Sequence, residues 1–336
     1  MAEPGLSEYV TAIQRRRQKV LRDNIKNNNA LVASMEEYDG YESYSGGRSI
    51  IEEMFFDEND TFMRYYGAQI LNTSLNPVMT AAEFDHKQFA IAVVISGRET
   101  RMNGGSEGVI DLATSRVKAA EITLENNYQA DMISDGTSDS GLQIGGLKLI
   151  VSKTPTTGTV GGIDRTSAAS AFYRNFKFDT VSDTTTPAPG GAATTAATIR
   201  PYYDYCINSL QRGTDGVKLI YAGQGHYQFL QTALQAMQRV TGDDNTVRAG
   251  YKLMKYQGIP VVNGGGVNFG GQTQVATDLS YFLNTRYLKM RYHKDANMEP
   301  LPEVQSINQD AKCKLMIFMG NMTCSAPKLQ GVMFDS

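Results

Sequence analysis

The stretch EGVIDLATSRVKAAEITLENNYQADMI, residues 107–133, decides the architecture of this chain. Apolar or small residues recur in it every three or four positions, which is the period of one helix face. They are Ile110, Ala113, Val117, Ala120, Leu124, Tyr128 and Met132. Ser106 can cap the start of a helix, and Gly136 follows its end. At roughly 1.5 Å per residue such a helix is a rod of roughly 40 Å, which is long for one globular domain. The stretch therefore predicts a spine helix.

A glycine-rich segment follows, TPTTGTVGGIDRTSAASAFYRNF at 154–176, and it raises the question of a phosphate-binding loop. A P-loop requires G-x-x-x-x-G-K-[ST], but the fifth residue after Gly158 is Ile163 and no Lys-Ser or Lys-Thr follows. The dinucleotide fingerprint G-x-G-x-x-G is also missing. The segment, like the glycines at 264–266, is interpreted as structural.

Two runs upstream of the helix favour extended structure, FMRYYGAQIL at 62–71 and KQFAIAVVISG at 87–97. Joined by a linker with Asn76-Pro77, they predict an extended two-stranded arm. An isolated pair of strands is marginally stable, so the apolar face of the second run should rest on something else. That face consists of Phe89, Ile91, Val93 and Ile95.

Charge is unevenly distributed near the N-terminus. The first segment is basic, with Arg15, Arg16, Arg17, Lys19, Arg22 and Lys26, whereas residues 36–60 are strongly acidic. A broken apolar stripe in the basic segment predicts a short surface helix. Such a segment can bury little surface alone and needs a neighbour; the alternative is a solvated terminus with a run of charge.

The second half predicts a compact α/β region after a Thr/Ala/Gly/Pro tract at 180–198, which is interpreted as a flexible surface loop. The expected elements are a helix starting at Pro201 and stopped by Gly213, a strand at 217–222, a helix at 227–240, a strand at 256–262, a strand at 278–293 with a turn at Asn284, and a long strand at 312–334 interrupted at Gly320.

Composition excludes several classes of protein. The chain has 336 residues, a net charge of -3 and three cysteines. This charge gives no reason to expect a dedicated nucleic-acid binder. The odd cysteine count argues against a disulfide framework and fits a reducing compartment. No signal peptide and no membrane span are expected, because no apolar run is long enough.

Residues that could carry catalysis or bind metal are scattered. His86, His226 and His293 lie far apart in the sequence, and none has metal-ligand spacing from a cysteine. Cys313 and Cys324 lie in an apolar strand and are interpreted as core residues. We therefore expect no enzyme, no catalytic residues, no cofactor and no metal site.

Several motifs, in order, resemble one branch of the major capsid proteins of tailed bacteriophages. They are TTGTVGGIDRTSAASAFYRN at 156–175, YQGIPVV at 256–262, YFLNTRYLKMRYH at 281–293 and GNMTCSAPKLQGVMF at 320–334. The resemblance implies an α+β, HK-97-type fold with an N-terminal arm at 1–50, an extended β-hairpin called the E-loop at 51–99, a P domain with the spine helix at 100–162, an A domain at 163–305 and a P-domain return strand at 306–336.

The implied function is assembly of hexamers and pentamers into an icosahedral shell around double-stranded DNA. The implied partners are copies of the same chain, a separate scaffolding protein, a portal, a possible decoration protein and non-specifically contacted DNA, without a membrane. The implied location is the virion, and the host cytoplasm during assembly. Intersubunit contacts are expected at Arg15, Arg16, Arg17, Phe89, Ile91, Val93, Ile95, Arg165 and Arg174. The alternatives are an encapsulin-like bacterial compartment of the same fold, a soluble enzyme built on the α/β region, and a tail-tube protein.

Overall fold

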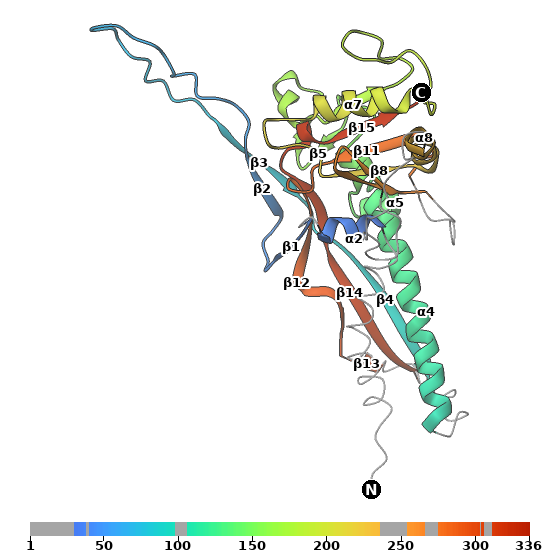
Figure 1. Ribbon diagram of the computed structural model, residues 1–336. Coiled ribbons are helices and arrows are strands. Elements are labelled where there is room, and N and C mark those ends of the chain that lie inside the picture. The colour runs from blue at the N-terminus through green and yellow to red at the C-terminus, as the bar shows by residue number, and fades with distance from the viewer. Residues whose placement is uncertain are drawn as a thin grey trace.

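The computed structural model describes residues 30–37, 40–97, 106–235, 254–265, 275–302, 304–305 and 311–336. Figure 1 shows three parts: a long helix lying along a long sheet, a compact region at one end of both, and a loop that projects away from the body. Arg15, Arg16 and Arg17 lie outside the described residues. Within the described part of the chain, no helix is long and apolar enough to cross a membrane.

The spine helix is confirmed as α4, Ser106–Ile133, a single helix of 28 residues. Val117, Leu124 and Tyr128 are buried along one of its faces, as the periodicity predicts. Two short helices follow, α5 at Ser138–Gly141 and α6 at Leu147–Ile150. The chain then forms a small hairpin from β5, Thr159–Val160, and β6, Ile163–Asp164, before the 3-10 helix η1 at Ala168–Tyr173.

The long sheet has five strands and lies beside α4 (Figure 1). Its strands are β1 at Tyr41–Tyr44, β4 at Lys87–Ser96, β12 at Leu288–Pro300, β13 at Val304–Gln305 and β14 at Ala311–Cys324. β14 pairs antiparallel with β4 on one side and with β12 on the other, and β1 adds to β12 in parallel. The short helix α2, Ala30–Glu37, precedes β1.

The prediction of an interruption at Gly320 is wrong, because β14 continues through this residue. Gly320 lies opposite Tyr292 on β12 and Lys87 on β4. A Cβ atom added at Gly320 would clash with the backbone carbonyl oxygen of Arg291. The glycine is therefore needed for a close approach of two strands and does not mark the end of one.

The predicted arm is also wrong in its choice of strands. The run at 87–97 forms β4 and pairs with β14, while residues 62–71 form no strand. Val93 and Ile95 are each only 5% exposed inside the chain. Phe89 stacks on Phe318 with ring centroids 4.9 Å apart, and Ile91 packs against the same core. The face of Phe89, Ile91, Val93 and Ile95 thus packs within its own subunit, where Phe89 and Ile91 stay partly exposed.

The arm of the structure is a different hairpin. β2, Ile50–Phe55, pairs antiparallel with β3, Met79–Phe84, so that Ile50 lies opposite Phe84 and Phe55 opposite Met79. The connecting residues 56–78 form the projecting loop of Figure 1. Alternation of apolar residues reports that a strand has one buried face, but it does not say which strand lies beside it. This explains why the sequence pattern assigned β4 to the arm.

The compact region contains a six-stranded sheet in the order β7, β15, β11, β8, β10, β9. The strands are β7 at Phe176–Asp179, β8 at Leu219–Ala222, β9 at Met254–Tyr256, β10 at Ile259–Asn263, β11 at Leu279–Leu283 and β15 at Gly331–Phe334. Helices α7, Ile199–Ser209, and α8, Gln224–Gln235, pack against it. The predicted α/β region is confirmed in these elements, except that the run at 278–293 forms two strands, β11 in this sheet and β12 in the long sheet. Residues 236–240 of the second predicted helix lie outside the described part of the chain.

The predicted boundary at residue 305, between the A domain and the return strand, does not separate the two sheets. β12 precedes that point and belongs to the long sheet, whereas β15 follows it and belongs to the six-stranded sheet. Between β14 and β15 lies the 3-10 helix η2, Pro327–Leu329, which carries the chain from one sheet to the other. The last part of the chain therefore ties the two regions together.

Candidate functional site at the root of the projecting hairpin

The projecting loop exposes large apolar side chains. Tyr66 is 92% exposed, Ile70 94% and Leu75 98%. Other exposed apolar side chains on the hairpin and its loop are Phe55, Phe62, Tyr65, Leu71 and Met79. Folded monomers rarely leave a large contiguous apolar surface uncovered, so such a surface indicates a contact with another molecule.

The loop also has few backbone contacts to hold it. The last hydrogen bond of the β2–β3 ladder runs from Phe56 N to the carbonyl oxygen of Val78, at 3.1 Å. Farther out, local turns form at Asn59 and Asn72, whose side-chain oxygens accept from Thr61 N and Ser74 N at 3.0 and 3.1 Å. Two strands alone are marginally stable in water, so the direction of the loop depends on its root.

The glycine pair of the 154–176 segment lies at this root. Gly161 and Gly162 have φ of 57° and 73° at the turn between β5 and β6, a two-residue turn that glycine accommodates best. The Gly161 carbonyl accepts a hydrogen bond of 2.9 Å from Glu83 N of β3. A Cβ atom at Gly161 would lie 2.9 Å from the Cβ of Ala82. The pair therefore packs backbone against the hairpin, which agrees with the structural interpretation.

The two arginines of the same segment connect parts of one chain. Arg165 is fully buried, at 0% exposed, and donates from Nη2 to the Ile150 carbonyl at 2.7 Å. Burial lowers the pKa of its guanidinium. Arg174 donates from Nε to the Arg165 carbonyl at 2.8 Å and from Nη2 to the Ser167 carbonyl at 2.9 Å. Both therefore hold neighbouring segments, and the buried Arg165 is not available to a neighbouring subunit.

The aromatic pair near the end of this segment connects the loop to the core. Phe172 packs on Phe56, the first residue of the loop, with ring centroids 5.4 Å apart. Tyr173 is buried and donates from its hydroxyl to the Cys324 carbonyl at 3.1 Å. The pair thus links the start of the loop to the end of β14.

Asn321, in the GNMTC motif of β14, lies on the other side of the root. Its Nδ2 donates to the carbonyl of Asp85, just after β3, at 2.8 Å. Its Oδ1 accepts from Gly145 N at 3.1 Å and from Met322 N at 2.9 Å. This side chain fixes the end of the hairpin against the segment that follows the spine helix.

A charged cluster completes the root. The Glu52 Oε1 atom of β2 accepts from Arg291 Nε and from Thr323 Oγ1, each at 2.8 Å. Arg291 also pairs with Glu42 of β1, at 2.8 Å from Nη1. The sequence pattern did not single out Glu52 or Arg291. The available signal was a carboxylate at the inward position between Ile50 and Met54, where the strand period predicts an apolar residue.

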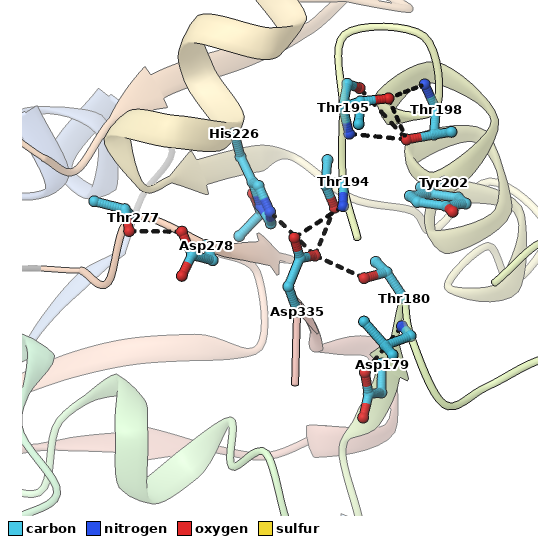
Figure 2. A network of polar contacts seen from close by, with 12 residues as sticks. Asp179, Thr180, Thr194, Thr195, Thr198, Tyr202, His226, Thr277, Asp278 and Asp335 are labelled. Atoms are coloured by element: carbon cyan, nitrogen blue, oxygen red, sulfur yellow. Dashed lines mark hydrogen bonds and ion pairs between the residues drawn. The ribbon is translucent and has the colours of Figure 1, made fainter. Parts of the chain in front are cut away.

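A second polar cluster holds the tract that was predicted as a flexible loop. The Asp335 carboxylate accepts from Thr180 Oγ1 at 2.6 Å, from Thr194 Oγ1 at 2.6 Å and from Thr194 N at 2.8 Å (Figure 2). Burial acts to raise the pKa of this carboxyl, but the interactions with His226, Thr180 and Thr194 outweigh it, so the pKa lies below its usual range. These hydrogen bonds hold the tract against the C-terminal residues of the chain.

This cluster includes a serine, a histidine and an aspartate in contact. Ser280 Oγ lies 2.9 Å from His226 Nδ1, and His226 Nε2 lies 3.6 Å from Asp335 Oδ1. Ser280 is 0% exposed, and its oxygen also contacts the Tyr203 hydroxyl at 2.8 Å. A nucleophile must reach its substrate, so a serine in this position is a core residue. Among the described residues, no group of three or more His, Cys, Asp or Glu side chains could hold a metal ion.

The chain was compared with known proteins. No family model matches it, and no curated protein matches it in sequence. In contrast, many solved structures share its fold.

One is the capsid asymmetric unit of cyanophage A-1(L), with a TM-score of 0.63 and 12% identity, covering 90% of this chain and 92% of the other. A second is the capsid of a native GTA particle, with a TM-score of 0.56, 9% identity and 90% coverage of both chains. A third is an encapsulin complex from Synechococcus elongatus, with a TM-score of 0.50 and 9% identity over 89% of this chain and 86% of the other. At these identities the likeness concerns the fold, and the chain has the HK-97-type fold of phage capsid subunits.

Proposed function

We propose that this chain is the major capsid protein of a tailed phage, which assembles into an icosahedral shell that encloses double-stranded DNA. The observation that carries the proposal is the projecting loop, whose apolar side chains are left exposed by the described residues of the subunit. On an HK-97-type fold, such a loop is suited to lie across the next copy.

The physical reason is the area that the loop leaves uncovered. Burying an exposed Leu, Ile or Phe side chain stabilises a contact by roughly 1.5–3 kcal/mol. A projection on one part of a molecule that binds a different part of the next copy makes a head-to-tail contact, and such contacts close into rings when the rotation allows it. Rings of six and five copies are the units expected for a shell.

We assign the parts of the chain accordingly. The hairpin β2–β3 with residues 56–78 would be the E-loop, α4 with the long sheet the P domain, and the six-stranded sheet with α7 and α8 the A domain. Residues before β1 would form the N-terminal arm, where the predicted contact of Arg15, Arg16 and Arg17 with a neighbour remains a proposal.

The remaining partners follow from the same proposal. They are a separate scaffolding protein, a portal, a possible decoration protein and packaged DNA that is contacted without sequence readout. The net charge of -3 is compatible with an inner surface that only confines the DNA. The location would be the virion, and the host cytoplasm during assembly. The proposed role is structural, without catalysis.

The test is to express the full chain, separate it by size exclusion and image it by negative-stain electron microscopy. Rings of five or six, sheets of rings, or shells are the expected result. A monomer or dimer, both alone and when co-expressed with the scaffolding protein of the same genome, would contradict the proposal.

A second candidate is the shell of an encapsulin-like bacterial compartment, which is favoured by the match to the Synechococcus encapsulin. Particles purified from the native source distinguish the two functions. Double-stranded DNA inside the particles supports the capsid, whereas a cargo enzyme without DNA supports the compartment.

A further inference from the structure

Two histidines that are far apart in the sequence, His86 and His293, meet at one tyrosine. His86 lies in the two-residue connection between β3 and β4, and His293 lies on β12. The ring of Tyr44, at the end of β1, stacks on His86 with centroids 5.2 Å apart and contacts His293 edge-on at 5.4 Å. The three rings therefore join the end of the projecting hairpin to β1 and to the long sheet.

The neighbours of His86 show which of its nitrogens carries the proton. Nε2 lies 3.1 Å from the carbonyl oxygen of Gly47, which can only accept a hydrogen bond, so Nε2 donates. Nδ1 lies 2.8 Å from the Tyr44 hydroxyl oxygen, and in a neutral ring this second nitrogen accepts from the hydroxyl. A neutral His86 thus connects the end of β3 to β1 through Tyr44, and to the β1–β2 connection through Gly47.

His293 likewise needs a neutral ring for its hydrogen bond. Its Nδ1 accepts from the backbone N–H of Asp295, with 3.2 Å between the two nitrogens. A protonated ring would turn an N–H towards this N–H, and because neither group can accept, the bond would be lost. The bond lies where β12 changes its register with β14, between Tyr292 and Asn297. Its loss would therefore disturb the strand segment that pairs with Tyr44 of β1.

The surrounding charges also favour neutral rings. Glu42 of β1 is already compensated, since it pairs with Lys289 at 3.2 Å and with Arg291 at 2.8 Å. Among the described residues, no ion pair joins a carboxylate to either of these two histidine rings. The other basic residues outnumber the acidic ones on the segments that meet here, so they repel two added positive charges. These residues are Arg48, Lys87 and Lys294 against Asp85 and Asp295.

The chain between β1 and β2 can pivot once the contact with His86 is lost. Gly46 and Gly47 have φ of 138° and 134°, a backbone conformation that glycine adopts readily and other residues rarely. Residues 45–48 are exposed, and a Cβ atom at Gly46 would meet nothing within 4 Å. The hydrogen bond from His86 to Gly47 ties this connection to the end of β3. The orientation of the hairpin on the long sheet therefore depends on it.

We propose that Tyr44, His86 and His293 form a pH-sensitive latch at the hairpin root, closed while both imidazoles are neutral and open when acid protonates them. Imidazole is the side chain that normally changes its charge between about pH 5 and pH 8. Because the closed root needs a neutral acceptor nitrogen on each ring, a falling pH shifts the equilibrium towards the open root. The inference goes beyond the proposed function, since it concerns the single subunit.

The latch is tested on unassembled full-length subunits, in which one tryptophan reports on the root. The chain contains no tryptophan, so Phe56→Trp gives a single reporter where the native ring packs on Phe172 with centroids 5.4 Å apart. It is placed in a chain with the native histidines and in a second chain with His86→Gln and His293→Asn. Both replacements keep an amide for hydrogen bonding but take up no proton between pH 8 and pH 5. His226 is present in both chains, so its titration cancels in the comparison.

Tryptophan emission is recorded from pH 8 to pH 5. The chain with native histidines should shift its emission to longer wavelength as the pH falls, because the reporter becomes exposed when the root opens. The double variant should show no shift. Emission that stays constant in the chain with native histidines, or that shifts equally in both chains, overturns the latch. Neither outcome bears on the formation of rings or shells, so the proposed function is tested separately.

Hydrogen exchange measured by mass spectrometry makes the same comparison without the reporter. In the wild-type chain, the amides of β2 and β3 should exchange about tenfold faster at pH 5.5 than at pH 7.5, after correction for the intrinsic rates. They include Glu83 N, which donates to the Gly161 carbonyl. The His86→Gln/His293→Asn chain should show no such increase, and the amides of α4 should be unchanged in both chains. Equal exchange of β2 and β3 in the two chains at both pH values contradicts the proposal.

A permanent charge tests the direction of the effect. His293→Lys places a positive charge beside Tyr44 at any of these pH values, so the root should already be open at pH 7.5. Ser43→Lys is the matched control, because it adds the same charge at an exposed position on the other side of β1 from Tyr44. Emission of the His293→Lys chain that matches that of Ser43→Lys at pH 7.5 would overturn the charge-driven opening.

Discussion

Glu52 of β2 and Arg291 of β12 lie 2.8 Å apart, between Glu52 Oε1 and Arg291 Nε, although 239 positions separate them in the sequence. This pair joins the projecting hairpin to the long sheet that runs beside the spine helix. Thr323 of β14 donates to the same carboxylate oxygen, at 2.8 Å. The direction of the hairpin is therefore fixed by three strands that belong to different parts of the chain.

Glu52→Gln should destabilise the subunit by about 1.5–3 kcal/mol, because it removes the charge from hydrogen bonds in a partly buried site and leaves Arg291 with one carboxylate less. Urea unfolding of the wild-type and variant subunits measures the loss. Glu53→Gln is the matched control, since Glu53 is exposed on the opposite side of the same strand. Equal stability of the two variants would show that the Glu52–Arg291 contact is not needed to hold the hairpin.

The stability that Asp335 contributes to the folded subunit should be lost in acid. Its pKa is lower in the folded chain than in the unfolded chain, where a carboxyl has a pKa of about 4. The folded state therefore gains stability from this group above the unfolded pKa, and loses it as the pH falls towards the folded pKa. Asp335→Asn should lower the free energy of unfolding at pH 7 and flatten its decline between pH 5 and pH 3, as measured by urea titrations.

Asp60→Asn, at an exposed position of the projecting loop, is the control for the loss of one carboxylate. A pH profile of Asp335→Asn that runs parallel to that of the wild type would mean that Asp335 contributes no pH-dependent stability. The same variant should also free the tract around Thr180 and Thr194, which limited proteolysis would detect as faster cleavage.

Gly320→Ala should destabilise the subunit by about 1–3 kcal/mol, because the new methyl group would force β14 and β12 apart at the Arg291 carbonyl. Thermal unfolding measures the change. Gly216→Ala is a suitable control, since a Cβ atom there meets nothing within 4 Å. A small effect at both positions would indicate that the two strands shift easily at this point.

The sequence predicted the elements that are defined by local periodicity. α4 has the expected bounds within one residue, and the strands and helices of the six-stranded region appear where the apolar runs lie. Helical periodicity depends on residues that are close in the sequence, so it can be recognised without knowing which segments pack against the helix. The motif resemblance also implied the fold that the solved structures show.

Strand pairing could not be predicted in the same way. β4 pairs with β14, more than 200 positions away, and the alternation of its side chains fits any partner with an apolar face. The contacts at the hairpin root are equally non-local: Glu52 with Arg291, Asn321 with Asp85 and Gly161 with Ala82 are neighbours in space although they lie far apart in the sequence. Asp335 gave no signal either, since one carboxylate next to a strand is ordinary.

The exposed apolar side chains of the projecting loop, residues 56–78, should matter for assembly and not for the stability of the subunit. The combined change Tyr66→Ser, Ile70→Ser and Leu75→Ser alters side chains that are 92%, 94% and 98% exposed, so the free energy of unfolding should stay within about 0.5 kcal/mol per site of the wild-type value. Since each of these side chains would contribute roughly 1.5–3 kcal/mol on full burial, rings and shells should be lost. Analytical ultracentrifugation and electron microscopy measure the assembled fraction. Leu142→Ser, at a position 69% exposed away from the loop, is the control and should assemble normally. Shells of the triple variant in wild-type yield would show that the projecting loop does not join the subunits.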